Sequence, residues 1–114
     1  MSVDTGVRVV LVTAPDEKVA EDLVRALVEE GLAACGNLVP GLVSIYRWRG
    51  RIERDSEVLI VLKTTASAVP ALLERVPALH PYEVPEVLVL PVEAGHGPYL
   101  AWVFGCVSTR DGEG

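Results

Sequence analysis

Residues 40–64 read PGLVSIYRWRGRIERDSEVLIVLKT, and the rest of the chain is arranged around them. This stretch predicts one long β-hairpin, because residues 42–48 are rich in β-branched and aromatic side chains and residues 57–63 are almost uninterruptedly apolar. Arg49-Gly50-Arg51 supplies the turn between the two arms, where Gly50 accepts a positive φ. Arms of this length exceed an ordinary strand of about 5–6 residues. The hairpin is therefore expected to project beyond its own sheet and to need a partner.

Upstream of the hairpin, the pattern predicts a strand followed by a helix. Residues 7–12 (VRVVLV) are apolar throughout except for one arginine, as expected of a strand that is central in its sheet. Residues 13–17 (TAPDE) signal a helix start, with Pro15 in the first turn and two carboxylates near the positive end of the helix dipole. Apolar residues recur at helical spacing from 19 to 28, and Gly31 stands where a C-terminal cap belongs.

The segments that flank the hairpin are predicted to be a strand and a second helix. Residues 32–39 lead into the hairpin as a strand that bends near Gly36 or at Pro40-Gly41, where a regular ladder is hard to maintain. After the hairpin, Ser67 is expected to cap a helix that carries Pro70 in its first turn.

The last third of the chain predicts a loop, a strand and a short helix. Residues 80–86 (HPYEVPE) contain too much proline for a helix or a strand and are expected to form an ordered loop. Residues 87–92 read as a strand, and Pro91 indicates a strand end or a sheet edge. Residues 98–104 begin a terminal helix, and residues 107–114 are expected to form a flexible tail.

This order of elements is β-α-β-β-α-β plus a terminal helix, which predicts an α+β, ferredoxin-like sandwich formed by one domain over residues 1–114. The fold hosts many unrelated activities and does not by itself indicate a function. A net charge of −6 and a pI near 4.8 disfavour nucleic acid as a partner. Mean hydropathy is high at +0.36, yet no apolar run approaches the ~20 residues of a membrane span. The surplus apolar surface is expected at a subunit interface.

Cysteine usage and the N-terminus both favour a cytoplasmic protein. The N-terminus lacks the basic region and the cleavage site of a signal peptide. Cys35 and Cys106 form no CxxC or metal-finger pattern, and both are expected to be buried small hydrophobes. A solvated turn explains the basic cluster at the hairpin tip better than RNA binding does; the cluster comprises Arg47, Arg49, Arg51 and Arg54.

Short motifs along the chain carry a family resemblance. They are Thr13-Ala14-Pro15, Ala33-Ala34-Cys35, Pro40-Gly41 with Ser44-Ile45-Tyr46, Trp48-x-Gly50, Glu57-Val58, Leu62-Lys63-Thr64 and, most specifically, His80-Pro81-Tyr82-Glu83-x-Pro85-Glu86. Over about residues 7–103 the chain resembles the CutA divalent-cation tolerance proteins. The resemblance implies a cytoplasmic homotrimer whose long hairpins extend into neighbouring subunits. It also implies a role in divalent-cation tolerance or in the response to metal ions.

The polar residues expected to converge do not form a known catalytic motif. No GxGxxG, GxxxxGK[ST], HExxH or GxSxG is present, so no enzymatic activity is predicted. Glu57 and Lys63 share one face of a strand by even spacing. In the resembling family the candidate positions gather in a cleft near a subunit boundary. The candidate binding site comprises Trp48, Glu57, Lys63, His80, Tyr82, Glu83 and Glu86.

Structural roles compete with a binding role at these positions. Glu57 and Lys63 are more often an ion pair than an acid and a base, and Trp48 at a strand end is usually an interface anchor. Three functional hypotheses remain: a non-enzymatic trimer in cation tolerance, a metal-binding protein, and an enzyme that uses Glu57, Lys63 and Glu86 on a small anionic substrate. The first includes a signalling trimer whose cleft binds a small ligand.

His80 is the one candidate metal ligand. Members of the resembling family with proposed copper ligands carry a cysteine at the end of the first strand and two adjacent histidines, whereas Val12 and Leu79 stand at two of those positions here. A single imidazole with nearby carboxylates predicts at most weak binding of copper or another divalent cation. No cofactor is predicted beyond that. His96, between two glycines, is expected to be exposed and without a role.

Overall fold

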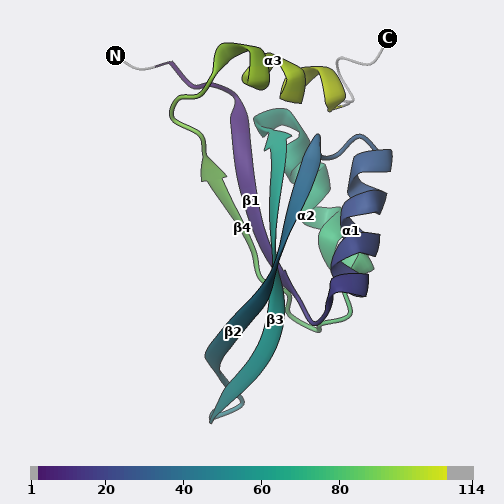
Figure 1. Cartoon of the computed structure of the whole chain (residues 1–114), viewed down its shortest axis with the longest axis vertical. Helices are drawn as coiled ribbons and strands as arrows, with labels where there is room; N and C mark the ends of the chain where they lie inside the picture. The colour runs from purple at the N-terminus through teal and green to yellow at the C-terminus, as the bar shows by residue number, and fades with distance from the viewer. Residues whose placement is uncertain (1–2, 108–114) are drawn as a thin grey trace.

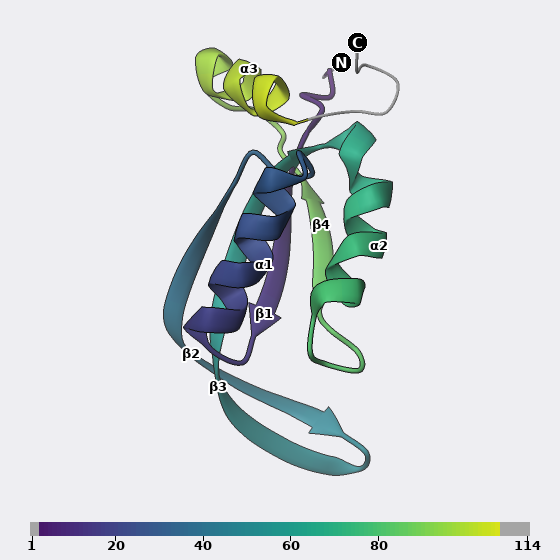
Figure 2. The same ribbon diagram turned by 90° about the vertical axis from the view of Figure 1, so that its right-hand side faces the viewer.

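The computed structural model describes residues 3–107, which form a four-stranded antiparallel sheet with two helices packed on one face (Figures 1 and 2). The elements are β1 Val7–Ala14, α1 Glu17–Glu29, β2 Cys35–Trp48, β3 Arg51–Thr65, a 3-10 turn Ala66–Ala68, α2 Val69–Leu79, β4 Val87–Pro91 and α3 Gly97–Cys106. The strand order β2-β3-β1-β4 places β1 inside the sheet and β4 at an edge. The predicted α+β, ferredoxin-like architecture is confirmed.

The main core lies between the sheet and the helices α1 and α2. Alternate strand residues point toward the helices, so that Val10, Ile60 and Leu62 are completely buried. Full burial of each such side chain contributes roughly 1.5–3 kcal/mol. The buried cluster comprises Val10, Val12, Ala14, Ala20, Leu23, Leu27, Ala33, Val58, Ile60, Leu62, Leu72 and Val76.

Helix α1 begins at Glu17, later than the sequence suggested. Asp16 is the N-cap, and its side chain accepts a hydrogen bond of 2.9 Å from the backbone N–H of Val19. Pro15 therefore precedes the cap and does not lie in the first turn. The helix ends as predicted, because Gly31 adopts φ +74°, a left-handed conformation that glycine tolerates without a steric penalty.

The hairpin is longer than predicted in both arms. β2 pairs with β3 from Cys35 opposite Lys63 to Trp48 opposite Arg51, with an irregularity between Val39 and Leu42 at the expected Pro40-Gly41 bend. The second arm starts at Arg51, although residues 51–56 are polar except for Ile52, because they pair with the apolar and aromatic end of β2. Figures 1 and 2 show the hairpin extending far below the helices. Its length accounts for the elongated shape of the molecule, which measures 46 × 32 × 23 Å.

The hairpin turn contains two residues and not the predicted three. Arg49 has φ +51° and Gly50 has φ +79°, whereas Arg51 already belongs to β3. Positive φ values at both central positions are those of a type I′ turn, whose twist matches that of the flanking strands. Glycine at the second position is the residue preferred there, whereas an arginine at the first position carries some strain.

Gly36 marks a place where β2 passes very close to α1. A Cβ atom there would lie 2.8 Å from Val24 Cγ1 and 2.9 Å from Leu62 Cδ2, so these packed side chains would have to shift. We therefore expect Gly36→Ala to lower the free energy of unfolding by about 1–3 kcal/mol. Chemical denaturation measures this loss. Gly97→Ala is the matched control, since nothing lies within 4 Å of its added Cβ, and an equal loss in both variants would contradict the prediction.

Helix α2 lacks the serine cap that the sequence suggested. Ser67 lies inside the 3-10 turn, and its hydroxyl is 3.2 Å from Thr65 Oγ1. The residue before the helix is Ala68, which makes no side-chain capping bond. Pro70 lies in the first turn as expected, and the helix continues two residues beyond Pro77 before it ends at Leu79. The preceding 3-10 turn takes over the role that a side-chain cap would have had.

Helix α3 lies across the end of the sheet where β1 starts (Figures 1 and 2). It covers a second, smaller core, in which Val7 and Val103 are almost completely buried. Val107 belongs to this cluster and is only 7% exposed, so the predicted tail does not begin at residue 107. Residues 108–114 lie outside the described part of the chain. The cysteine prediction was also wrong, because Cys35 is half-buried and Cys106 on α3 is exposed.

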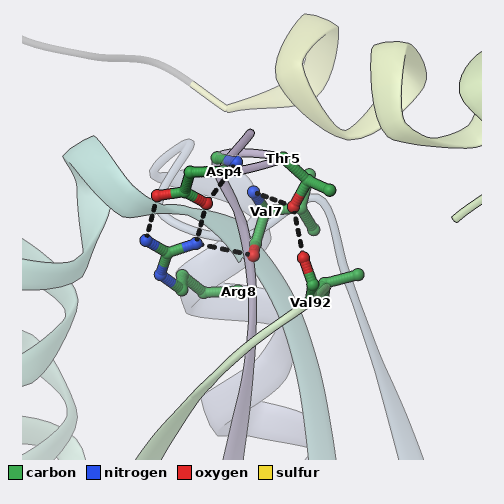
Figure 3. A network of polar contacts seen from close by, with 6 residues as sticks. Asp4, Thr5, Val7, Arg8 and Val92 are labelled. Carbon is green, nitrogen blue, oxygen red and sulfur yellow. Dashed lines mark hydrogen bonds and ion pairs between the residues drawn. The ribbon is translucent and has the colours of Figure 1, made fainter. Parts of the chain in front are cut away.

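A polar network holds the N-terminal segment at the same end (Figure 3). Asp4 accepts hydrogen bonds of 2.9 and 2.8 Å from the Arg8 guanidinium and one of 2.8 Å from the N–H of Gly6. The Thr5 hydroxyl donates a 2.6 Å hydrogen bond to the carbonyl of Val92, which follows β4. The segment before β1 is thereby fixed to the first and last strands.

The Asp4 carboxylate makes the stability of this end dependent on pH. The hydrogen bond from Arg8, followed by that from Gly6, holds the pKa of Asp4 well below its usual range. A lowered folded pKa stabilises the protein above the unfolded value of about 3.9, and the effect is lost as pH falls toward the folded value. We expect the urea midpoint of wild type to exceed that of Asp4→Asn at neutral pH, with the difference shrinking below pH about 4. A pH-independent difference, or an equal one in Glu74→Gln, would refute this assignment.

The face of the sheet opposite α1 and α2 is apolar, and we call it the open face. Leu88 and Leu90 on the edge strand β4 are 54% and 46% exposed there, and Val39 on β2 is 47% exposed. The open face consists of Val9, Leu11, Val39, Leu59, Val61, Leu88 and Leu90, which alternate with residues of the core. An antiparallel sheet usually turns a polar face to water.

Among residues 3–107, none of the helices has the length and apolarity required to cross a membrane.

Candidate functional site

A cavity of about 430 Å³ lies between the hairpin and the loop that joins α2 to β4. Tyr46 and Trp48 reach it from β2, and Asp55 and Glu57 reach it from β3, because each pair is spaced by two residues and shares one strand face. The hairpin curls under the sheet toward the loop (Figure 2). Residues of this loop supply the opposite wall of the cavity. The complete lining is Thr13, Tyr46, Trp48, Asp55, Glu57, Tyr82, Glu83, Val84 and Glu86.

A tyrosine from the loop holds the most buried carboxylate of this cavity. The Tyr82 hydroxyl donates a 2.6 Å hydrogen bond to Glu57 Oε2, and Glu57 is only 8% exposed. Burial, and then the hydrogen bond to Glu57, raises the pKa of Tyr82 well above its usual value. The phenol therefore stays protonated and continues to donate over the whole physiological pH range. This bond also joins the loop to the base of the hairpin.

A second tyrosine and carboxylate pair lies nearer the hairpin tip. The Tyr46 hydroxyl donates a hydrogen bond to Asp55 Oδ2 across the two arms. That bond, helped by slight burial and by the charge of Asp55, raises the pKa of Tyr46 to about 12. The pair fixes the Tyr46 ring in the cavity wall.

The pairing of Tyr46 with Asp55 has a measurable consequence. Because the Asp55 carboxylate is the main cause of the raised pKa, we expect Asp55→Asn to move the pKa of Tyr46 from about 12 toward the usual value of about 10. Ultraviolet absorbance of the phenolate, followed against pH, measures the shift. Tyr46→Phe serves as the control, since it identifies which of the three tyrosine transitions belongs to this residue. An unchanged titration in Asp55→Asn would show that the hydrogen bond does not form in solution.

The rim of the cavity carries an arginine from the hairpin turn. The Arg49 guanidinium carbon lies 5.3 Å from the centroid of the Trp48 ring, and Nη2 lies 3.1 Å from Glu83 Oε1. The side chains of Arg49 and Glu83 are 71% and 70% exposed, so their ion pair contributes little to stability. It nevertheless brings the hairpin tip to the loop.

His80 adjoins the cavity but does not line it. Its ring is buried, with Nε2 2.7 Å from the carbonyl oxygen of Thr13, and its Nδ1 accepts a 3.1 Å hydrogen bond from the N–H of Tyr82. Because Nδ1 accepts, the proton resides on Nε2, which donates to Thr13. Both ring nitrogens are engaged, so a metal could bind His80 only by displacing one of these bonds. Here His80 fixes the start of the loop against the end of β1.

Lys63 is not brought to this cavity. It lies six residues from Glu57 on β3, a separation of about 20 Å at roughly 3.3 Å per residue. Its ammonium group donates to Asn37 Oδ1 near the other end of the strand. Even spacing correctly predicted a shared face for Glu57 and Lys63, but it did not imply that they are neighbours. The other six predicted residues either line the cavity or, in the case of His80, position its loop.

Potential metal ligands do not gather in the described part of the chain. Within residues 3–107, no three His, Cys, Asp or Glu side chains are grouped closely enough to hold a metal ion. Val12 is completely buried in the core, and Leu79 packs against the same cluster. The positions of two proposed copper ligands in the resembling family are therefore filled by structural apolar side chains.

Four residues of the lining were not predicted from the sequence: Thr13, Tyr46, Asp55 and Val84. Tyr46 is part of the motif Ser44-Ile45-Tyr46, but this motif indicated only a strand and not a binding role. Asp55 was missed because residues 51–56 were not expected to form a strand. Extending the second arm back to the turn would have placed Asp55 on the same face as Glu57.

Residues 8–105 match a family model described as CutA1 divalent ion tolerance protein. The divalent-cation tolerance protein CutA of Thermus thermophilus is 57% identical over 95 residues, which are 83% of this chain and 92% of that protein. Protein CutA of Mus musculus is 58% identical over 98 residues, which are 86% of this chain and 55% of the mouse protein. The chain thus spans about half the length of its mouse relative.

Solved structures agree with these sequence matches. The divalent cation tolerance protein (Cut A1) of Thermus thermophilus has a TM-score of 0.87 at 53% identity, covering 90% of this chain and 99% of that one. CutA1 from a psychrotrophic Shewanella bacterium, described as a stable protein, has a TM-score of 0.88 at 34% identity, covering 94% of this chain and 100% of that one. The predicted family resemblance is confirmed.

Proposed function

The chain belongs to the CutA1 divalent ion tolerance family. We propose that it acts in divalent-cation tolerance as a non-enzymatic, cytoplasmic homotrimer whose cavity takes up cations. One observation carries the cavity's role: within the part of the chain that the structure describes, its lining contains four carboxylates and no basic side chain. The four are Asp55, Glu57, Glu83 and Glu86. A concave site with charges of one sign raises the local concentration of counter-ions.

Metal binding at this cavity is expected to be weak. Tight sites present three or four ligands to a partly dehydrated ion, and the described residues bring together no such set. Carboxylates spread around a water-filled cavity instead attract a hydrated divalent cation through their field. His80 is a poor primary ligand, since both of its ring nitrogens already have partners.

The trimer is supported by the apolar surface that a single chain leaves exposed. The hairpin carries Ile45 and Ile52 at 69% and 63% exposure, and the open face of the sheet adds Leu88 and Leu90. Each buried apolar Å² contributes roughly 25 cal/mol, so covering these surfaces with neighbouring subunits is favourable. The number of three subunits comes from the family resemblance.

The enzyme hypothesis receives less support from the geometry. It requires Glu57, Lys63 and Glu86 to act on one substrate, yet Lys63 lies about 20 Å along β3 from Glu57. General acid and base groups have to reach the same reacting atoms within hydrogen-bond distance. The alternative of a signalling trimer that binds a small ligand uses the same cavity as the favoured proposal.

Isothermal titration of chelator-treated protein with Zn²⁺ and Cu²⁺ tests the proposal. We expect weak binding that falls further in the double variant Glu83→Gln with Glu86→Gln and is unchanged in Glu74→Gln, whose side chain lies outside the cavity on α2. Binding that is tight, stoichiometric and abolished by His80→Ala would contradict it and establish an imidazole site. Equal affinity in the double variant would remove the cavity from cation binding.

A further inference from the structure

Glu57 is a buried carboxylate without a cationic partner among residues 3–107. It is only 8% exposed, and its one hydrogen bond is the one that Oε2 accepts from Tyr82. Since no buried polar side-chain atom in this part of the chain lacks a partner, Oε1 must remain accessible, and Glu57 lines the cavity. Buried charges in proteins are normally paired. No residue among 3–107 supplies a positive charge to this carboxylate, which leaves Oε1 available to a cation that enters the cavity.

The walls of the cavity suit an organic cation better than a metal ion. Three aromatic rings, those of Tyr46, Trp48 and Tyr82, line it beside the carboxylates. Hydrogen bonds from both tyrosine hydroxyls to Asp55 and Glu57 hold their rings in place. An ammonium or guanidinium group gains from the electron-rich face of such rings. A hydrated metal ion keeps its water shell and gains little from them.

Arg49 shows how the rim already accommodates such a group. Its guanidinium carbon is 5.3 Å from the Trp48 ring centroid, and its Nη2 is 3.1 Å from the Glu83 carboxylate. Deeper in the cavity an aromatic residue and a carboxylate are again neighbours, because the Tyr82 hydroxyl donates to Glu57 and both residues line the cavity. The Arg49 side chain is 71% exposed and is easily displaced.

We propose that the cavity is a binding site for a small organic cation with two or more ammonium or guanidinium groups, such as an aliphatic diamine or polyamine. One charged end pairs with the buried carboxylate Glu57, and the other pairs with the rim carboxylates Glu83 and Glu86. The aliphatic chain lies against Trp48 and Val84. A volume of about 430 Å³ falls within the usual range of small-molecule sites. The inference rests on the proposed role of the cavity in cation uptake and adds the chemical class of the ligand.

Trp48 provides a direct signal for testing this proposal. The chain has two tryptophans, so Trp102→Phe leaves Trp48 as the only one. In that background, putrescine, spermidine and agmatine are titrated at constant ionic strength while fluorescence is recorded. We expect saturable binding that Glu57→Gln weakens by about tenfold or more, the usual effect of losing one charge-assisted contact. Glu74→Gln, on α2 and outside the cavity, should bind as well as the parent.

A second variant separates the aromatic contribution from the charge. Trp48→Leu keeps every carboxylate, so by isothermal titration it should bind Zn²⁺ as before while its affinity for spermidine falls severalfold. Circular dichroism confirms the fold of each variant. Should Glu57→Gln fail to fold, Glu86→Gln replaces it, because Glu86 is exposed.

Each of the other outcomes overturns a distinct statement. Binding of Zn²⁺ without saturable amine binding would overturn the ligand class and leave the proposed function intact, whereas binding of neither cation would overturn both. Amine binding that is equally weakened in Glu74→Gln would show only non-specific charge attraction. A Glu57→Gln variant with a weakened trimer and unchanged amine affinity would assign the missing charge to a neighbouring subunit.

Discussion

His80→Ala is expected to lower the free energy of unfolding by about 2–4 kcal/mol, although the residue lies in a loop. The imidazole is buried and bonds the carbonyl of Thr13 at 2.7 Å and the N–H of Tyr82 at 3.1 Å. Removal of the ring leaves both backbone groups without partners and creates a void. Each buried unsatisfied group costs about 1–3 kcal/mol. Chemical denaturation at neutral pH measures the loss.

Two other histidine variants sharpen this prediction. His80→Gln retains an N–H that can donate to Thr13 and should recover about 1 kcal/mol of the loss. His96→Ala, at an exposed position, should change stability by less than about 0.5 kcal/mol. If His80→Ala were as stable as His96→Ala, the structural role of His80 would be disproved.

Ile45→Asp is expected to dissociate the proposed trimer into folded monomers. Ile45 is 69% exposed on the hairpin and has Arg54 as its cross-strand partner, so the monomer tolerates a carboxylate there. In an assembled interface the same carboxylate would be buried, at a cost of several kcal/mol per subunit. Three copies of the substitution multiply that cost. Sedimentation equilibrium measures the change in association state.

Val28→Asp is the matched control, because Val28 is a partly exposed apolar residue on α1, away from the hairpin. It should remain associated like the parent, while circular dichroism shows the same fold for all three proteins. A trimer of unchanged stability in Ile45→Asp would place the subunit interface elsewhere.

The architecture was predictable because local patterns and long-range pairing agree. The apolar run of β1, the helical spacing of α1 and the proline content of residues 80–86 each indicate one conformation. The wrong predictions concern segments where contacts with the rest of the chain override the conformation that the local sequence prefers. Residues 51–56 are polar except for Ile52, yet they form a strand because the apolar and aromatic end of β2 lies opposite them. Ser67 is of a residue type that often caps helices, but it lies inside the 3-10 turn Ala66–Ala68 that precedes α2.

The sequence identified most residues of the candidate site, but it did not predict how their side chains are arranged. Glu57, Tyr82 and Trp48 were identified, and they line one cavity. Lys63 was included because alternation specifies a face of a strand and says nothing about distance along it. The role of His80 depends on which atoms its two nitrogens meet, and that follows only from the packing of the loop against β1.

The cavity has one wall on the hairpin and the other on the loop between α2 and β4, and this arrangement ties occupancy to assembly. A molecule held between the two walls favours one angle of the hairpin, and neighbouring subunits that grip the hairpin also favour one angle. Ligand binding and assembly are thermodynamically linked. If assembly raises the affinity for the ligand by some factor, ligand binding raises the affinity between subunits by the same factor. If the ligand and the neighbouring subunits favour the same hairpin angle, each strengthens the binding of the other. If they favour different angles, each weakens it. The concentration of subunits is thus itself a variable in any measurement of binding.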